Sequence, residues 1–416
     1  GMTMTIKRDY YLQQLISSKS NNLIKIVTGI RRSGKSFLLF NLFHNHLIET
    51  GISEDHIIEI ALDDRLNKNL RDPDVILQHI HERIVDDKLY YIILDEVQMI
   101  DEFTDVLNSL LHIRNADVYV TGSNSKFLSK DVVTEFRGRG DEIHLFPLSF
   151  AELYNSIGGD KFELWKSYYT YGGLPGILEL DSEKKKAAYL RSLHETVYLK
   201  DIIERNNLKN SEEFMELMRV MASCIGSPCN PSKLENTFKS VKNETLDRKT
   251  ISKYLSYMED AFLIEKSMRY DIKGRKYIGT LSKYYFQDIG LRNALLNFRQ
   301  VEENHIMENV IYNELRLRGF CVDVGMVEAR TAKERKQLEV DFVANMADRR
   351  YYIQSAFAMP DDDKREQESA SLKRIDDSFK KIIIMRDDIK PYHDNNGFYI
   401  VGLMDFLLKP DLIEQL

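Results

Sequence analysis

A glycine-rich stretch near the N-terminus has the residue types and spacing of a loop that holds phosphate groups. The stretch GIRRSGKS, residues 29–36, fits the pattern G-x-x-x-x-G-K-[ST]. Its glycines let the backbone curl so that successive amide N–H groups can point at phosphate oxygens. The Lys35 ammonium suits the β- and γ-phosphates, and the Ser36 hydroxyl suits Mg²⁺. We predict a nucleoside triphosphate site whose cofactor-binding residues are Gly29, Arg32, Ser33, Gly34, Lys35, Ser36 and Phe37.

Two acidic residues follow a short apolar run further along the chain. Residues 91–94, YIIL, are typical of a strand buried on both faces, and Asp95 and Glu96 come next. Side chains that follow such a strand lie at the carboxyl edge of the sheet, where ligands bind in open α/β sheets. Asp95 is then placed to hold Mg²⁺ together with Ser36, and Glu96 to orient an attacking water. The alternative is a solvated acidic pair that only ends a strand.

Further candidate catalytic residues follow the next apolar run, residues 118–120. The stretch TGSNS comes after it, and its Asn124 is placed to reach the γ-phosphate or the attacking water. Turn formation alone would also explain these small polar residues. Arg139, with Arg137 as a substitute, is a candidate to neutralise charge on the transferred phosphoryl group, within one chain or across a subunit boundary. A plain surface arginine is the alternative.

The elements that must position these residues alternate between strand and helix. Apolar runs at residues 24–27 and 57–62 predict buried parallel strands, and the pattern after Lys35 predicts a helix. Residues 73–85 predict another helix. An amphipathic helix over residues 6–17 would either close over the adenine or pack against the core. We therefore expect an α/β core with a parallel sheet.

Composition sets the broad class of the protein. With 416 residues, the chain is expected to form about two or three domains. The net charge of −7 argues against a coat of nucleic acid over the whole surface but leaves room for a local basic face. The three cysteines form neither a disulfide framework nor a paired C-x-x-C zinc site. No apolar run approaches the roughly 18 residues of a membrane span, so we expect a cytoplasmic protein without a membrane partner.

The motifs as a set resemble a known family. They are similar, in the same order along the chain, to those of prokaryotic AAA-type ATPases with a C-terminal domain of unknown function. The stretches that carry this resemblance are GIRRSGKS, LDEVQ, TGSNS, FRGRG and PLSFAEL, and later YYTYGGLP, YLKDIIERNNL, ENVIYNELRLRGF and YYIQSA. The resemblance implies an AAA-type core over residues 1–150, a helical lid over 151–210, a winged-helix segment over 211–285 and a tail over 286–416. It also implies ATP as the nucleotide, and, by analogy, assembly into a homo-oligomer.

A basic surface is expected on the winged-helix segment. The third helix of this segment carries Arg248, Lys249 and Lys253 on one side, and the turn after it carries further cations at residues 273–276. A basic helix followed by a basic wing suits duplex DNA, whose backbone attracts lysine and arginine. Winged helices inside ATPases also serve as lids or as docking surfaces for a protein partner, and that alternative stays open.

The tail resembles a degenerate restriction-nuclease fold of the PD-(D/E)xK type. That family reads Glu, then Asp, then Glu-x-Lys, and here Glu308 and Asp341 match the first two positions. The Glu-x-Lys position has become Gln354-Ser355-Ala356, although Glu366 or Glu368 could in principle substitute. A neutral amide is a weaker Mg²⁺ ligand than a carboxylate, and alanine cannot replace an ammonium. We therefore predict no nuclease activity.

Two functions remain open on these residues. The first is an ATPase that uses Mg²⁺ and drives conformational change on a DNA or protein partner. The second is a nucleotide-gated switch or scaffold with little turnover. The intact acidic pair favours hydrolysis, while a working ATP-dependent nuclease is disfavoured by Gln354 and Ala356.

Overall fold

The computed structural model describes residues 6–125, 140–241, 244–330, 332–358 and 362–416. The chain divides into two compact units, which we describe separately. Unit 1 comprises Gly1–Leu148, Leu174–Glu179 and Asp260–Phe262. Unit 2 comprises Ser149–Gly173, Leu180–Glu259 and Leu263–Leu416. No helix among the described residues is both long enough and apolar enough to cross a membrane.

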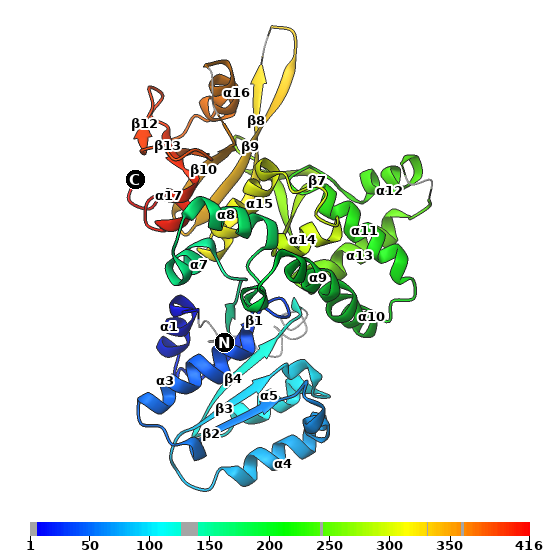
Figure 1. The fold of residues 1–416 in the computed structure, drawn as a ribbon, viewed down its shortest axis with the longest axis vertical. Helices are drawn as coiled ribbons and strands as arrows, with labels where there is room; N and C mark the ends of the chain where they lie inside the picture. The colour runs from blue at the N-terminus through cyan, green and yellow to red at the C-terminus, as the bar shows by residue number, and fades with distance from the viewer. Residues whose placement is uncertain (1–5, 126–139, 242–243, 331, 359–361) are drawn as a thin grey trace. The chain divides into compact units, whose positions relative to one another are not determined.

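A sheet of five strands, each parallel to its neighbours, forms the centre of unit 1 (Figure 1). The strand order is β2-β3-β4-β1-β5. The strands are β1 (Ile24–Thr28), β2 (Ile57–Ala61), β3 (Tyr90–Asp95), β4 (Ala116–Gly122) and β5 (Gly140–His144). Because β4 lies between β1 and β3, the residues after β4 reach the carboxyl edge of the sheet between those after β1 and β3. The expected α/β core with a parallel sheet is confirmed.

Helices cover both faces of this sheet. Alternate residues of each strand point to opposite sides, and because the residues on both sides are apolar, each side packs against helices. Ile92 and Leu94 of β3 belong to one apolar cluster, with residues of α4 and α5, whereas Tyr91 and Ile93 belong to a second, with residues of α1 and the helical stretch after Gly34. The helical elements are α1 (Asp9–Ser17), α2 (Lys35–Phe37), η1 (Leu38–Phe43), α3 (His44–Glu49), η2 (Glu54–His56), η3 (Arg65–Arg71), α4 (Pro73–Arg83), η4 (Val97–Met99), α5 (Phe103–Leu111) and η6 (Pro175–Glu179).

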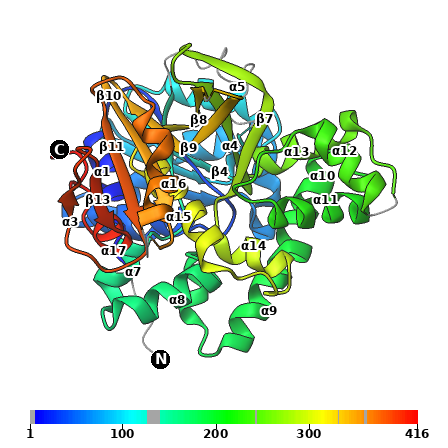
Figure 2. The ribbon, with the colours of Figure 1, turned by 90° about the horizontal axis from the view of Figure 1, so that it is seen from above.

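Unit 2 begins with helices. The first, α7, starts at a capping box, in which the Ser149 hydroxyl accepts from the Glu152 amide and the Glu152 carboxylate accepts from the Ser149 amide. Figure 2 shows α10 to α13 as one group of neighbouring helices. The helices are α7 (Phe150–Ile157), α8 (Lys161–Tyr171), α9 (Glu183–Leu193), η7 (His194–Tyr198), α10 (Leu199–Asn206), α11 (Ser211–Ser223), α12 (Pro231–Ser240), α13 (Arg248–Asp260), α14 (Ile289–Leu295), α15 (Glu303–Leu317), α16 (Asp362–Lys373) and α17 (Leu403–Leu408).

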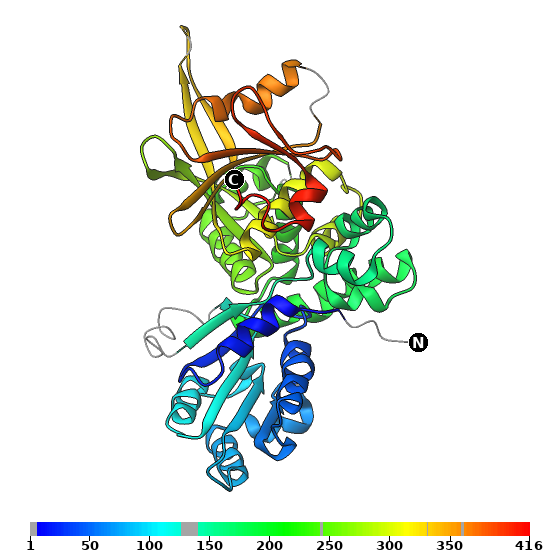
Figure 3. The ribbon, with the colours of Figure 1, turned by 90° about the vertical axis from the view of Figure 1, so that its left-hand side faces the viewer.

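An eight-stranded mixed sheet completes unit 2, in the order β12-β13-β11-β10-β9-β8-β6-β7. Figure 3 shows its β8–β9 hairpin (yellow) extending beyond the neighbouring strands. The boundary expected at residue 285 or 286 falls next to the end of β7, and β6 and β7 belong to the same sheet as the tail strands. The strands are β6 (Ile264–Asp271), β7 (Lys276–Phe286), β8 (Cys321–Arg330), β9 (Arg335–Met346), β10 (Arg349–Ala356), β11 (Lys380–Met385), β12 (Tyr392–His393) and β13 (Tyr399–Gly402).

Candidate functional site

The loop between β1 and α2 turns through left-handed backbone conformations. Gly34, at the start of the helical stretch, has φ 102°. Gly29 has φ 154°, and a Cβ on it would lie 2.5 Å from the Leu145 carbonyl oxygen, so only glycine fits there. Arg32 also has a positive φ, 72°, and its side chain is exposed. The glycine spacing of the motif therefore corresponds to a real backbone requirement.

Lys35 is buried inside this loop. Its Nζ donates to the carbonyl oxygens of Gly29, at 2.8 Å, and Ile30, at 3.1 Å. The same ammonium lies 3.9 Å from the Glu96 Oε1, and only 4% of the lysine is exposed. A positive charge is thus held between the loop after β1 and the acidic pair after β3.

Asp95 lies at the end of β3, next to the hydroxyl that follows Lys35. Its Oδ2 accepts from the Ser36 hydroxyl at 2.7 Å, and its Oδ1 from the Thr121 hydroxyl at 2.5 Å. Burial raises the pKa of Asp95, and the two hydroxyl hydrogen bonds oppose this shift. The predicted metal pair, Ser36 and Asp95, is therefore in direct contact.

Glu96 adopts a left-handed conformation, with φ 54° and ψ 52°, which is costly for a residue with a side chain. Its amide donates to the Thr121 hydroxyl at 2.8 Å, and its Oε2 accepts from the Ser123 hydroxyl at 3.0 Å and from the Gln98 amide. Two hydroxyls at the end of β4 and just after it therefore fix the positions of both acids. Thr121 and Ser123 belong to the predicted TGSNS turn, but their contacts with the acids could not be read from the sequence.

The remaining predicted site residues differ in their surroundings. Asn124 is buried after β4, and Phe37 is 39% exposed on the helical stretch. Ser33 is fully buried, and its hydroxyl makes no hydrogen bond with any described residue. An orphaned hydroxyl in the loop is consistent with a phosphate ligand, because buried polar groups are normally satisfied. Arg139 and Arg137 lie outside the described residues.

Sequence reasoning missed one residue that braces the loop. Arg8 is buried, and its guanidinium donates to the carbonyl oxygens of Ser33 at 3.2 Å and Phe146 at 2.8 Å. No local signal marks an arginine at the start of an amphipathic helix as a contact of a loop 25 residues away.

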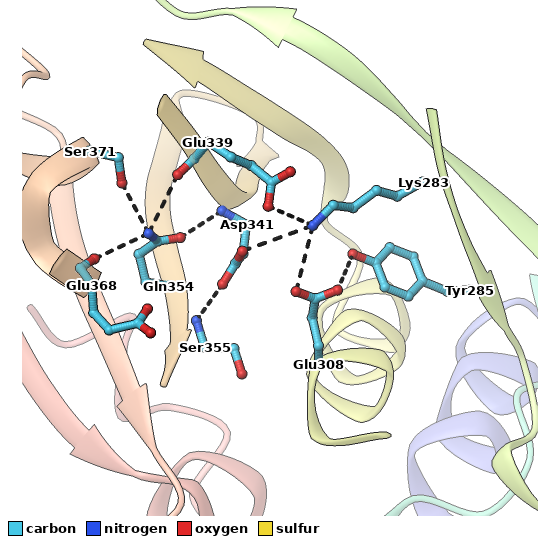
Figure 4. A network of polar contacts seen from close by, with 9 residues as sticks. All are labelled: Lys283, Tyr285, Glu308, Glu339, Asp341, Gln354, Ser355, Glu368 and Ser371. Carbon is cyan, nitrogen blue, oxygen red and sulfur yellow. Dashed lines mark hydrogen bonds and ion pairs between the residues drawn. The ribbon is translucent and has the colours of Figure 1, made fainter. Parts of the chain in front are cut away.

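A second buried polar network lies in unit 2 (Figure 4). The Lys283 ammonium, from β7, lies 2.7 Å from the Glu339 Oε2, 3.6 Å from the Glu308 Oε1 and 4.0 Å from the Asp341 Oδ1. The Tyr285 hydroxyl donates to Glu308 at 3.1 Å. Burial alone would lower the pKa of Lys283, but the surrounding carboxylates outweigh it and raise that pKa. Burial, together with neighbouring carboxylates, raises the pKa of both Glu308 and Asp341.

Gln354, at the expected glutamate position of the tail, is fully engaged elsewhere. Its Oε1 accepts from the Asp341 amide at 2.7 Å. Its Nε2 donates to the Ser371 hydroxyl at 3.0 Å and to the Glu368 carbonyl oxygen at 3.2 Å (Figure 4). Ala356 is buried in an apolar cluster. Within the described part of the chain, no group of three or more His, Cys, Asp or Glu side chains has the geometry to hold a metal ion.

Comparison with known protein families agrees with this geometry. Residues 21–154 match the family described as an AAA domain, so the expected nucleotide-binding core is confirmed at that level. Residues 162–302 match a domain of unknown function, DUF8612. The resemblance of the tail to a nuclease stays a prediction.

Two relatives cover most of the chain. An uncharacterised protein of Haemophilus influenzae is 33% identical over 413 residues, which are 97% of this chain and 99% of that protein. An uncharacterised protein of Methanocaldococcus jannaschii is 29% identical over 374 residues, which are 86% of this chain and 79% of that protein.

Among solved structures, the Aeropyrum pernix Orc1 protein in complex with DNA matches 71% of this chain and 93% of its own, with 12% identity and a TM-score of 0.31. Cdc6p from Pyrobaculum aerophilum matches 75% of this chain and 97% of its own, also with 12% identity and a TM-score of 0.31. Similarities of this extent say nothing about what the chain binds.

Proposed function

Because the chain carries an AAA domain and belongs to the same family as the Haemophilus influenzae protein, we propose that it binds ATP with Mg²⁺ at the β1–α2 loop and hydrolyses it. One observation carries the proposal: Lys35 and Ser36 lie beside Asp95 and Glu96, although 59 residues separate Ser36 from Asp95. An ammonium, a hydroxyl and two carboxylates at one sheet edge are the groups that phosphoryl transfer to water needs.

The roles follow from the positions of the side chains. The amides of the loop from Gly29 to Ser36, with the Lys35 ammonium, would hold the phosphates, and Ser36 and Asp95 would hold the Mg²⁺. When bound, the metal would neutralise charge on the phosphate oxygens. Glu96 would orient the attacking water and accept its proton. Asn124, after β4, is proposed to contact the γ-phosphate or this water, and Arg139 to neutralise charge that develops on the γ-phosphate.

Metal removal separates this proposal from the switch or scaffold alternative. We expect steady-state release of phosphate from ATP in millimolar Mg²⁺, and loss of that release in EDTA, because Ser36 and Asp95 need a cation between them and the phosphates. A malachite green assay measures the phosphate. Tight ATP binding with no phosphate release above background would favour the nucleotide-gated switch instead.

The partner of this cycle is also a proposal. We propose a lid over residues 151–210 and a winged-helix segment over 211–285, whose helices α11 to α13 precede the β6–β7 hairpin. Lys249 and Lys253 are exposed on α13 and suit DNA, and a protein partner is the alternative. Assembly of several copies would supply Arg139 across a subunit boundary, which motivates a homo-oligomer.

We propose that the tail, residues 286–416, has a nuclease-like fold that does not cut. Two contacts support this. The side-chain amide of Gln354 is hydrogen-bonded to residues of β9 and α16, and the Lys283 ammonium lies among the carboxylates at whose positions an active nuclease of this type would hold its metal. A supercoiled plasmid should therefore stay intact after hours with the full chain in Mg²⁺ or Mn²⁺. Nicking that disappears in Asp341→Asn would contradict the proposal.

A further inference from the structure

Two hollows adjoin in unit 2, around the segment that follows α16. The larger has a volume of about 770 Å³ and the smaller about 510 Å³. Ile375, Asp377 and Phe379 line both of them. Each hollow is within the range of pockets for small ligands, about 300–1,000 Å³, and the three shared residues join the two.

The walls of these hollows are strongly basic. The larger is lined by the cations Lys273, Arg275, Arg330, Arg350 and Arg374. The smaller adds Lys373, Lys380 and Lys381. Against these eight cations stand three acids, Glu328, Asp376 and Asp377. The local excess of five positive charges contrasts with the net charge of −7 of the whole chain.

Two of the three acids are already paired, whereas at least three of the eight cations have no partner among the described residues. Asp377 accepts from the Tyr352 hydroxyl at 2.6 Å, and Glu328 lies 3.4 Å from the Arg335 guanidinium. In contrast, the side chains of Lys273, Arg275 and Arg374 make no hydrogen bond or ion pair with any described residue, and all three residues are exposed. Their charges are available to an anion from outside the chain.

An aromatic ring stands where the two hollows meet. Phe379 is 39% exposed, so its ring is accessible from both hollows. The Arg350 guanidinium lies 5.4 Å from the centre of this ring and 5.5 Å from that of Tyr270, and it donates to Asn345 at 2.7 Å. The phenyl ring is thus supported by a cation that is itself held in place.

We propose that the two hollows form one binding site for a single strand of nucleic acid, with phosphates on the unpaired cations and a base stacked on Phe379. A row of cations with an interleaved aromatic ring is the pattern that such strands require. A duplex does not fit, because its bases stack on each other and are closed to Phe379. Lys273 and Arg275, expected on a winged-helix face, here share a pocket with Arg350 and Arg374 of the tail. The inference does not depend on the ATP proposal.

Fluorescence anisotropy with the full chain and no nucleotide tests the site. The probes are a labelled 20-nucleotide oligo-dT and a duplex of equal length, each in low and moderate salt. We expect the single strand to bind more tightly than the duplex and to weaken steeply as salt rises. The double variant Arg275→Glu/Arg374→Glu should lose at least about tenfold in affinity, because two phosphate contacts become repulsive.

The aromatic contact has its own variants. Phe379→Ala should lose about tenfold in affinity, and Phe379→Tyr should retain it, because a base stacks on either ring. A separate control matches the charge change of Arg275→Glu/Arg374→Glu. The double variant Lys184→Glu/Lys209→Glu makes that change at exposed positions that do not line the hollows, and it should bind the single strand as the wild type does.

Three results would overturn the proposal. The first is no binding of oligo-dT in low salt. The second is a duplex preference lost in Lys249→Glu/Lys253→Glu but not in the pocket variants, which would place the contact on α13. The third is equal binding of polyglutamate with no effect of Phe379→Ala, which would reduce the site to a general polyanion surface. ATP turnover measured on the same variants without DNA stays a separate readout of the nucleotide site.

Discussion

Glu96→Gln is expected to lower ATP turnover by about 100- to 10,000-fold while ATP still binds. The amide retains an oxygen that can accept from Ser123, so the turn after β3 keeps its shape. It cannot accept a proton from water, and that is the step for which the carboxylate is needed. Phosphate release under saturating ATP measures the loss, and a fluorescent ATP analogue measures the binding that should persist.

Two further variants make the result specific. Lys35→Ala should lose binding as well as turnover, because it removes the ammonium that lies against the Gly29 carbonyl oxygen and 3.9 Å from Glu96. Glu102→Gln is the matched control: Glu102 also has a positive φ, 53°, but it is exposed and outside the site, so its turnover should equal that of the wild type. Wild-type turnover in Glu96→Gln would remove Glu96 from the proposed role.

The nucleotide-binding core could be predicted because its signals are local. The strands β1 to β4 are built around short apolar runs, and the polar residues that matter come directly after the run, as Asp95 does at the end of β3. The structure extends the run expected at residues 91–94 by one residue at each end, to Tyr90–Asp95, whereas the run expected at 57–62 ends one residue earlier, at Ala61. The glycine spacing adds a second local signal for the phosphate-binding loop. Its physical reason is that a Cβ would not fit at a position such as Gly29.

The network in unit 2 could not be predicted in the same way. Lys283 meets Glu339 across 56 residues, and the contact depends on strand register and on the pairing of β6 with β8. The sequence places Lys283 in a wing and Glu339 in a separate tail, and no local pattern links the two. The replacement of the expected Glu-x-Lys lysine by Ala356 was visible, but the buried ammonium that β7 supplies instead was not.

Lys283→Met is expected to destabilise unit 2 by about 3–5 kcal/mol at pH 7.5. The change leaves the carboxylates of Glu308, Glu339 and Asp341 without their buried cation. Glu308 and Asp341, whose pKa values burial already raises, must then take up protons, so their pKa values in the folded state rise further above the unfolded values near 4. A carboxyl group with a raised folded pKa binds more protons in the fold, and stability therefore falls as pH rises above about 4. The deficit should be smaller at pH 5 than at pH 7.5.

Trp165 allows a direct measurement, because it is the one tryptophan of the chain and is fully buried in the apolar core of unit 2. Urea unfolding followed by its fluorescence gives the stability of each variant at both pH values. Lys276→Met, an exposed lysine on the same strand, should change stability by less than about 0.5 kcal/mol. Lys283→Met/Glu308→Gln should recover part of the loss, because it removes one of the uncompensated charges. A deficit that is absent at pH 7.5, or larger at pH 5, would show that the ammonium does not hold these acids together.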